Sequence, residues 1–243
     1  MEDVPSIVTQ GVVLRFANFR EHDRMLTILS PQYGRIDALS RGCRKPKSSL
    51  MPVSELFVSG EFVLYQAHEH FTLTSATLRD SFYPLRLEPY RLTCASYMAG
   101  LCAAAVQPGQ DAAELYALLL KGLYYLSYDD NADALETTSA FLLLFASATG
   151  YRPRLTRCAH CRTPLDPEQN GSFDIEAGGL CCPDCTSRST FAVSQQQIDW
   201  MKSTLKSGLL PKEKSDGSAL FELLRRFVES RLDVRVKASK LLP

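Results

Sequence analysis

"CAHCRTPLDPEQNGSFDIEAGGLCCPDC", residues 158–185, holds five of the eight cysteines in this 243-residue chain. Two Cys-x2-Cys pairs lie within it, and 20 residues separate them. One such pair supplies two thiolates from a single tight turn, and structural zinc is held by four ligands of this kind at the corners of a tetrahedron. The spacing therefore predicts one structural zinc ion, bound by Cys158, Cys161, Cys182 and Cys185.

The additional cysteine, Cys181, leaves a choice of ligand in the second pair. Its pairing with Cys185 gives a Cys-x3-Cys turn, which is less usual in zinc sites, so we expect Cys182 to be the ligand. Cys181 then fills a small apolar space. His160 lies between the two cysteines of the first pair, and we expect its ring to face solvent. The glycines at 178–179 predict a tight turn before the second pair.

Two catalytic interpretations of these cysteines agree less well with the sequence. "CPDC" at 182–185 matches a thioredoxin-type dithiol, but that interpretation leaves the first pair unexplained. A zinc deaminase requires His-x-Glu, whereas Glu69 directly follows His68 in "HEH". Four cysteine ligands leave a metal without an open position, so the zinc is predicted to be architectural. The sequence contains no nucleophile-elbow, P-loop or dinucleotide-binding motif, and we do not expect an enzyme.

The hydrophobic pattern before this segment begins with a strand-rich part. Residues 1–80 are rich in β-branched and aromatic residues, with turn residues between the apolar runs. Five short strands in this length suit a small closed barrel, most simply an OB-fold, with an SH3-like barrel as the alternative. The strands are expected at 6–16, 25–30, 34–40, 54–67 and 71–78.

From residue 88 onward, apolar residues recur with helical spacing. Asp111 and Ser194 are expected to cap the beginnings of two helices, while Gly150 and Gly208 mark helix ends. The helices on both sides of the cysteines are predicted to form one bundle, which makes the cysteine segment an insertion. They are expected at 88–107, 111–130, 131–150, 195–206 and 216–232.

The predicted fold class is therefore α+β with several domains: a five-stranded OB-fold barrel followed by a helical bundle with an inserted four-cysteine zinc unit. "MEDVPSIVTQ" lacks the features of a secretory signal, and the longest apolar run, 140–150, is too short to cross a bilayer. We therefore expect a cytoplasmic protein without membrane contact, whose cysteines stay reduced. The predicted domains are a barrel at 1–80, the first part of the bundle at 81–150, the zinc-binding insertion at 151–190 and the second part of the bundle at 191–243.

The chain has 27 basic and 27 acidic residues, so affinity for nucleic acid has to come from local clusters of charge. Residues 15–47 contain eight Lys or Arg and three acids, a local net charge of +5. A surface loop can be basic without a ligand, but residues 151–162 and 225–240 are basic as well, which favours a positive face that binds phosphates. The predicted phosphate-contacting residues are Arg15, Arg24, Arg35, Arg41, Arg44, Lys45 and Lys47.

Three stretches together resemble the RecO family of bacterial DNA-repair proteins. They are "GVVLRFANFREHDRMLTILSPQYGRIDALSRGCRKPKSSL" (11–50), "FLLLFASATGYRPRLTRCAHC" (141–161) and "GGLCCPDC" (178–185), and the basic tail "VRVKASKLL" (234–242) is similar as well. Arg162 stands where the family tends to have glycine, and Cys181 is additional. The resemblance implies an OB-fold, a helical bundle and a zinc-binding insertion, the same division that the hydrophobic pattern predicts.

The resemblance also implies a function. RecO-like proteins are recombination mediators that bind single- and double-stranded DNA, anneal complementary strands and engage single-strand-binding protein (SSB). With RecR they help to load RecA on coated DNA, which places them at the nucleoid during repair. The alternative from another class is a zinc-ribbon adaptor of transcription or translation that binds RNA or protein. A thiol oxidoreductase is a weaker alternative.

Overall fold

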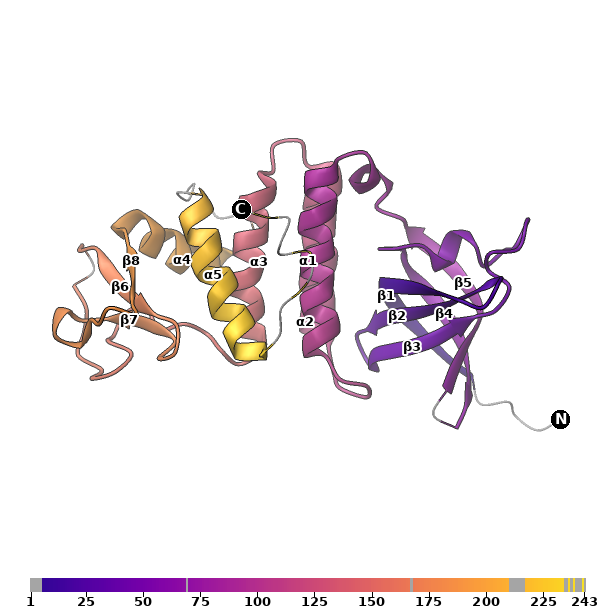
Figure 1. Cartoon of the computed structure of the whole chain (residues 1–243), viewed down its shortest axis with the longest axis horizontal. Coiled ribbons are helices and arrows are strands. Elements are labelled where there is room, and N and C mark those ends of the chain that lie inside the picture. Colours follow the sequence, from indigo (N-terminus) through magenta and orange to yellow (C-terminus); the bar gives the residue numbers. More distant parts are fainter. Residues whose placement is uncertain are drawn as a thin grey trace. The chain divides into compact units, whose positions relative to one another are not determined.

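The computed structural model describes residues 6–68, 70–166, 168–209 and 217–233, together with Val236, Ala238 and Leu242. The chain divides into two compact units (Figure 1). Unit 1 comprises Met1–Leu92 and Ala99–Ser127, and unit 2 comprises Thr93–Met98 and Tyr128–Pro243. Residues 81–150, expected as one part of the bundle, thus contribute to both units. Within the described residues, every helix is too short or too polar to cross a membrane.

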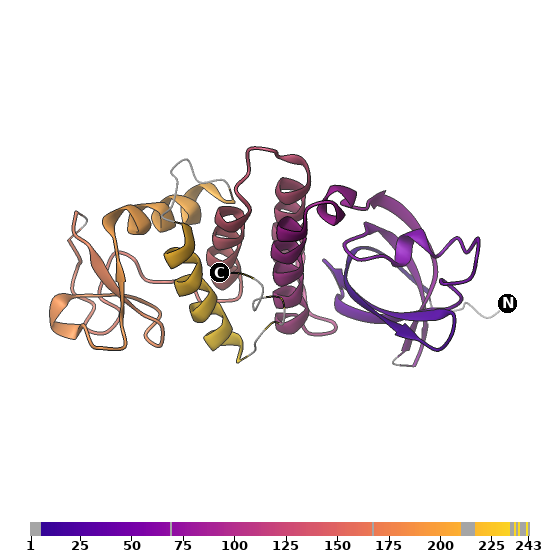
Figure 2. The same ribbon diagram turned by 45° about the horizontal axis from the view of Figure 1, so that its top comes forward.

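The strands of unit 1 close into a barrel in the order β1-β2-β3-β5-β4, which appears as a ring in Figure 2. Only the β3–β5 pairing is parallel, and the closed five-stranded order is OB-like, as the sequence predicts. Val13, Ile28 and Phe62 are among the apolar side chains that fill its interior. The strands are β1 (Ser6–Phe19), β2 (Asp23–Ser30), β3 (Gly34–Ser40), β4 (Ser59–Ala67) and β5 (His70–Asp80).

The fourth strand begins later than the sequence pattern indicates. The 3-10 turn η1 (Pro52–Ser54) occupies the expected start, and β4 begins only at Ser59. Between them Phe57 has a φ of 66°, which is a left-handed conformation that an extended strand does not contain. The Phe57 side chain is nonetheless buried, and its N–H donates to the Val13 carbonyl at 2.9 Å. The apolar residues Phe57 and Val58 therefore form core without forming strand.

Two helices complete unit 1, and their connection is bonded to the barrel. They are α1 (Pro89–Ala105), whose residues 93–98 belong to unit 2, and α2 (Ala113–Tyr128). The N–H groups of Gly109 and Ala112, in the connection, donate to carbonyls of the β2–β3 turn, each at 2.9 Å. The 3-10 turn η2 (Tyr83–Arg86) precedes α1, and Arg86 bonds to two carbonyls of the barrel side, those of Ser81 and Leu56. These bonds tie the α1–α2 connection and the turn before α1 to the barrel.

Unit 2 contains three helices and a small sheet. α3 (Ala134–Ala148) packs against α4 (Gln195–Ser207) and α5 (Gly217–Leu232). The sheet has the order β7-β6-β8 and lies between α3 and α4 in the sequence, so the cysteine segment is an insertion as predicted. Its strands are β6 (Gly171–Asp174), β7 (Gly179–Cys181) and β8 (Phe191–Val193), with the 3-10 turn η3 (Pro183–Cys185) after β7.

The predicted helix boundaries in unit 2 follow from local hydrogen bonds. Ser194 forms a capping box with Gln197 at the start of α4, and the helix ends at Gly208. At the end of α3, Gly150 has a φ of 89° and its N–H donates to the Ser147 carbonyl, while the N–H of Tyr151 donates to the Ala146 carbonyl. This pair of bonds is a Schellman motif.

In unit 1, α2 begins at Ala113, and the Asp111 carboxylate accepts the Ala113 N–H at 3.0 Å.

The junction between barrel and helices predicts different effects for two glycines with the same backbone conformation. Gly34 and Gly109 have φ values of 64° and 76°. An added Cβ at Gly34 lies 2.3 Å from the Gln107 carbonyl oxygen, whereas at Gly109 it meets nothing within 4 Å. We expect Gly109→Ala to lower the free energy of unfolding by about 1 kcal/mol, from backbone strain alone. Gly34→Ala adds the steric clash and should cost about 3 kcal/mol.

Urea denaturation of the two zinc-loaded variants measures this difference. The shared left-handed backbone makes Gly109→Ala the control for strain without a clash. Equal losses of stability in the two variants would contradict the close packing of Gly34 on the connection between α1 and α2.

Candidate metal centre and nucleic-acid interface

The structure brings four of the cysteine sulfurs together in unit 2. The Sγ atoms of Cys158, Cys161, Cys182 and Cys185 all lie within 4.8 Å of one another. Those of Cys161 and Cys182 are 3.6 Å apart. Four sulfurs at about 2.3 Å from a tetrahedral zinc ion would lie about 3.8 Å from each other. The donor set and its spacing therefore fit one zinc ion, and the four predicted ligands form this cluster.

Two short turns hold these sulfurs, and a main-chain bond joins the first turn to β7, the strand that precedes the second turn. The Arg162 N–H donates to the Cys158 carbonyl at 3.1 Å in the first turn, and the Cys185 N–H donates to the Cys182 carbonyl at 3.0 Å in the second. The Ala159 N–H donates to the Leu180 carbonyl, which ties the first turn to β7. Arg162 has a φ of 65°, a conformation that glycine adopts without strain. This explains why glycine suits the position in the resembling family.

The surroundings of the sulfurs favour the thiolate form at one of them. Burial raises the pKa of the Cys158 thiol, but the N–H groups of Cys182, Cys161 and His160 that point toward its sulfur outweigh burial and bring the pKa to about 5. The neighbouring thiols of Cys182 and Cys161 raise the pKa of Cys185 to about 12. Without a cation the cluster therefore holds both thiolates and thiols. A bound divalent cation takes the place of the remaining protons.

A hydrogen-bonded pair braces the first turn against the sheet. His160 Nε2 lies 3.0 Å from Asp174 Oδ2, and the other carboxylate oxygen of Asp174 accepts the Ala177 N–H at 3.0 Å. His160 is exposed, as the sequence suggests, but its ring is held by β6. The sulfur of Cys181 lies within 4.8 Å of these two groups and outside the four-sulfur cluster. Cys181 is buried there, next to the metal ligands without joining them.

The basic residues of the barrel do not form one surface. Four of the seven lie exposed on the basic loop, which we define as residues 41–51 between β3 and η1. The loop is built from successive turns, in which N–H groups of Lys45, Ser48 and Met51 each donate to a carbonyl three residues earlier. The buried side chain of Cys43 anchors it. The four exposed residues are Arg41, Arg44, Lys45 and Lys47.

The basic loop meets the β1–β2 turn at a surface depression of about 420 Å³. Asp23 accepts the Gly42 N–H at 2.7 Å, and the Arg44 side chain donates to the Glu21 carbonyl at 3.0 Å, so the turn and the loop are bonded together. We call this hollow the barrel depression. Three cationic side chains line it, together with two carboxylates and His22, and the cations are Arg20, Arg41 and Lys45.

Arg20 is absent from the residues predicted as contacts, although it lies in the basic stretch 15–47. It has a left-handed φ of 52°, and its guanidinium lies 5.2 Å from the centre of the Phe19 ring. The sequence signal for it was the local excess of positive charge. Its place beside Lys45, 25 residues later in the chain, depends on the pairing of the strands.

Arg44 and Lys47 do not line the barrel depression, and neither do the three predicted residues outside the basic loop. Arg24 is paired with Glu55 at 2.7 Å, and its side chain is only 16% exposed. Arg35 donates to the Ala103 carbonyl at 3.3 Å, near the C-terminal end of α1. Arg15 is exposed on β1 and donates to the Thr27 hydroxyl at 3.1 Å. Because Arg24 and Arg35 are already bonded within unit 1, their structural roles compete with any role in binding.

Two arginines of the basic C-terminal stretch are paired with carboxylates within unit 2. Glu222 pairs with both Arg225 and Arg226, and Glu229 accepts a further bond from Arg225. Burial lowers the pKa of the Arg225 guanidinium, but Glu222 outweighs it and the net shift is upward, which keeps the charge in place. Arg235, Lys237 and Lys240 lie outside the described residues.

Two family models match the chain almost end to end. The model described as "Recombination protein O N terminal" matches residues 1–82, and the one described as "Recombination protein O C terminal" matches residues 86–240. The chain belongs to the RecO family. Membership implies a role in DNA repair and recombination. A match that covers both the barrel and the zinc unit also favours this family over a stand-alone zinc-ribbon adaptor.

Relatives agree with this assignment over most of their lengths. The DNA repair protein RecO of Acetivibrio thermocellus is 30% identical over 232 residues, which cover 93% of this chain and 91% of that protein. The proteins of the same name from Desulforamulus reducens and Symbiobacterium thermophilum are each 28% identical over 241 residues, 96% of this chain, and are covered to 92% and 94%.

The positions of Cys181 and Cys182 predict opposite results for two conservative substitutions. After dialysis against metal-free buffer, wild-type protein and Cys181→Ser are expected to retain one metal ion per chain by elemental analysis. Cys182→Ser removes one of four ligands and should lose that ion, because the site binds metal through thiolates. Cys181→Ser is the matched control, since it changes the adjacent thiol in the same way. Loss of metal from Cys181→Ser, with retention by Cys182→Ser, would reverse the ligand assignment.

Proposed function

We propose that this protein is a non-enzymatic recombination mediator that binds single- and double-stranded DNA and anneals complementary strands. Within the bacterial cytoplasm, at the nucleoid, it would engage SSB-coated DNA and act with RecR to load RecA. Family membership supports the general role. The observation that carries the DNA-binding part is the barrel depression, where Arg20, Arg41 and Lys45 meet on an OB-like barrel.

The barrel depression is suited to phosphates and unsuited to reading bases. Lys45 and Arg41 are exposed and lie on a loop whose main chain is fixed by its turns, so the positions from which both side chains project are set before DNA arrives. Contacts to the phosphate backbone carry no direct sequence information. We therefore propose that binding is independent of sequence and strongly dependent on salt. A helix that would enter the major groove is not required for this mode of binding.

Annealing follows from the same electrostatics. Two complementary strands repel each other through their phosphates, and a protein cation that neutralises phosphates on one strand lowers that repulsion. Most bases must stay free to pair, so most contacts have to be made to the backbone. The cations of the basic loop meet this requirement, because their side chains are exposed and can reach phosphates without enclosing the bases.

We further propose that the metal in unit 2 is zinc. Four thiolate ligands favour zinc over magnesium or calcium, which prefer oxygen. Bound zinc would supply cross-linking between the two cysteine turns, with no chemistry at an open position. The buried residues around the cluster are Cys158, Ala159, Cys181 and Cys182, so this part of the chain has little apolar core of its own.

The barrel depression predicts a change in the salt dependence of DNA binding. With oligothymidylate, the double variant Arg41→Gln/Lys45→Gln should bind more weakly, and the slope of log K against log salt should be smaller by about 1.4, since each lost phosphate contact to single-stranded DNA contributes about 0.7. Arg79→Gln/Lys121→Gln removes two exposed charges elsewhere in unit 1 and should keep the wild-type slope. A slope unchanged by the first double variant would exclude the barrel depression as the contact.

The annealing function is tested with complementary oligonucleotides that are coated with SSB. Zinc-loaded full-length protein should accelerate pairing, followed by fluorescence, and the acceleration should fade as salt rises from about 50 to about 200 mM because phosphate contacts weaken. The Arg41→Gln/Lys45→Gln variant should anneal more slowly than the Arg79→Gln/Lys121→Gln control. Failure of the folded wild-type protein to accelerate annealing at low salt would contradict the mediator function.

A further inference from the structure

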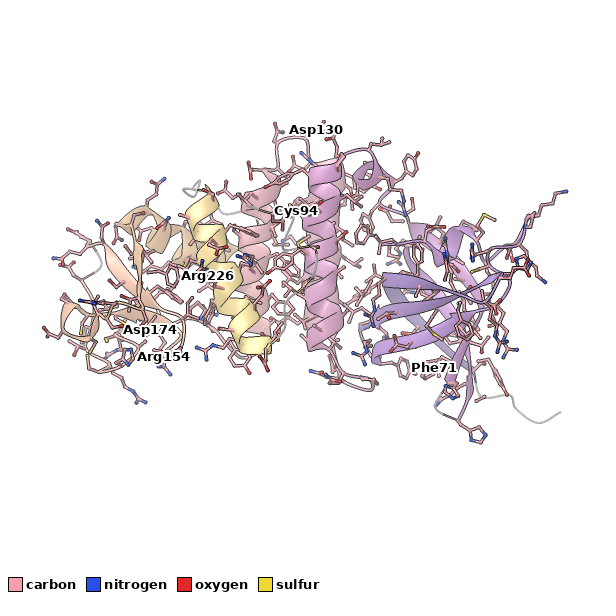
Figure 3. All side chains as sticks on the ribbon, viewed as in Figure 1. Phe71, Cys94, Asp130, Arg154, Asp174 and Arg226 are labelled. Atoms are coloured by element: carbon pink, nitrogen blue, oxygen red, sulfur yellow. The ribbon has the colours of Figure 1, made fainter. Side chains whose placement is uncertain are left out.

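Besides the barrel depression of unit 1, a basic hollow lies in unit 2. It is far from the barrel in sequence and separate from the predicted zinc ligands. Its volume is about 190 Å³, and we call it the arginine depression. Three arginines and one glutamate give its lining a net charge of +2. Tyr151 and Phe227 supply aromatic surface. The charged residues are Arg152, Arg154, Arg231 and Glu176, and Figure 3 shows Arg154 in the part of unit 2 that carries β6 and β7.

Main-chain bonds fix the walls of the arginine depression. The Schellman motif at the end of α3 sets the position of Tyr151, and the Arg154 N–H donates to the Gly178 carbonyl at 3.0 Å. Gly178 has a φ of 73°, and a Cβ added there would lie 3.1 Å from an Arg231 nitrogen. Glycine at this position therefore leaves the space that the Arg231 guanidinium occupies.

The positively charged guanidinium of Arg231 is held in place under the arginine depression. Its guanidinium donates to the carbonyls of Ile175 and Glu176, both at 2.6 Å, and lies 5.7 Å from the centre of the Tyr151 ring and 5.3 Å from that of Phe227. Its Nε is buried without a hydrogen-bond partner in the described structure. The carbonyls do not neutralise the charge, so Arg231 makes the depression electropositive and supports one face of Tyr151.

Arg152 and Arg154 present their charges to the outside. Both are exposed, and within the described part of the chain neither forms an ion pair with a carboxylate. Arg154 uses one nitrogen to donate to the Ala159 carbonyl at 3.1 Å, which holds its side chain over the zinc unit. The Tyr151 ring, which lines the same depression, is 41% exposed. Guanidinium groups beside an accessible aromatic ring match a phosphodiester and its base.

We propose that the arginine depression is a second binding site for single-stranded DNA, in which Arg152 and Arg154 contact phosphate and Tyr151 stacks on a base. This inference rests on the proposed function and deepens it, because a chain with one site in each unit holds two strands at once. An acidic peptide would satisfy the arginines as well, but the exposed ring favours an unpaired base. The zinc then has an indirect role, since it holds Arg154 and the turn at Gly178 in place.

Photocrosslinking to full-length, zinc-loaded protein locates the strand directly. The probe is an oligothymidylate that contains 4-thiothymidine, and mass spectrometry identifies the crosslinked peptides. We expect crosslinks both in the barrel, near the basic loop, and at Tyr151. Arg152→Glu should reduce the Tyr151 crosslink about tenfold and leave the barrel crosslink unchanged. Arg188→Glu makes the same charge change at another exposed site of unit 2 and should alter neither.

The outcomes separate this inference from the proposed function. Crosslinks in the barrel alone, or a Tyr151 crosslink that Arg152→Glu leaves intact, would overturn the second site and retain the first. If an acidic peptide binds at Tyr151 and no DNA crosslink forms there, the depression would be assigned to a protein partner and the inference would be overturned. Absence of crosslinks in both units would overturn both proposals. Unchanged zinc content in Arg152→Glu confirms that the variant is folded.

Discussion

The close approach of four thiols is the constraint on which the inserted part of unit 2 depends. Sulfurs within 4.8 Å of one another repel when they are deprotonated, so the arrangement requires a cation or shared protons. Around the sulfurs the insertion buries few apolar side chains to offset the entropy of ordering its loops. A metal bound by the four cysteines would supply that stabilisation. It would also brace the turn at Gly178 and the bond from Arg154, which shape the arginine depression.

A second constraint separates arginines that hold the fold from those that remain available. Arg24 is only 16% exposed and is paired with Glu55, because a buried charge without a partner is costly. Arg225 likewise forms ion pairs with Glu222 and Glu229 on the same helix. Carboxylates thus form ion pairs with the arginines that stabilise the fold. The cations of the basic loop remain available to bind a ligand. Local excess of charge arises although the whole chain is neutral.

The sequence predicts the regular elements well because their signals are local. The cap at Ser194 and the glycine at 150 define helix ends within one or two residues, whereas α3 begins three residues later than expected, behind a cap at Asp133. The short strands β6 to β8 have no such signal, since three or four residues cannot show a period. The late start of β4 arises from the left-handed Phe57. The pairing of Arg24 depends on Glu55, 31 residues away, which no local pattern reveals.

Neutrality of the chain has a consequence for how its sites act. A neutral protein is not drawn to DNA over long distances, and at physiological salt charges are screened beyond about 8 Å. Binding then depends on a few contacts at short range, each of them weak and sensitive to salt. The two proposed sites on one chain would raise the effective concentration of a second strand without requiring either site to bind tightly. Weak contacts would also release the duplex once it has formed, as the proposed annealing function requires.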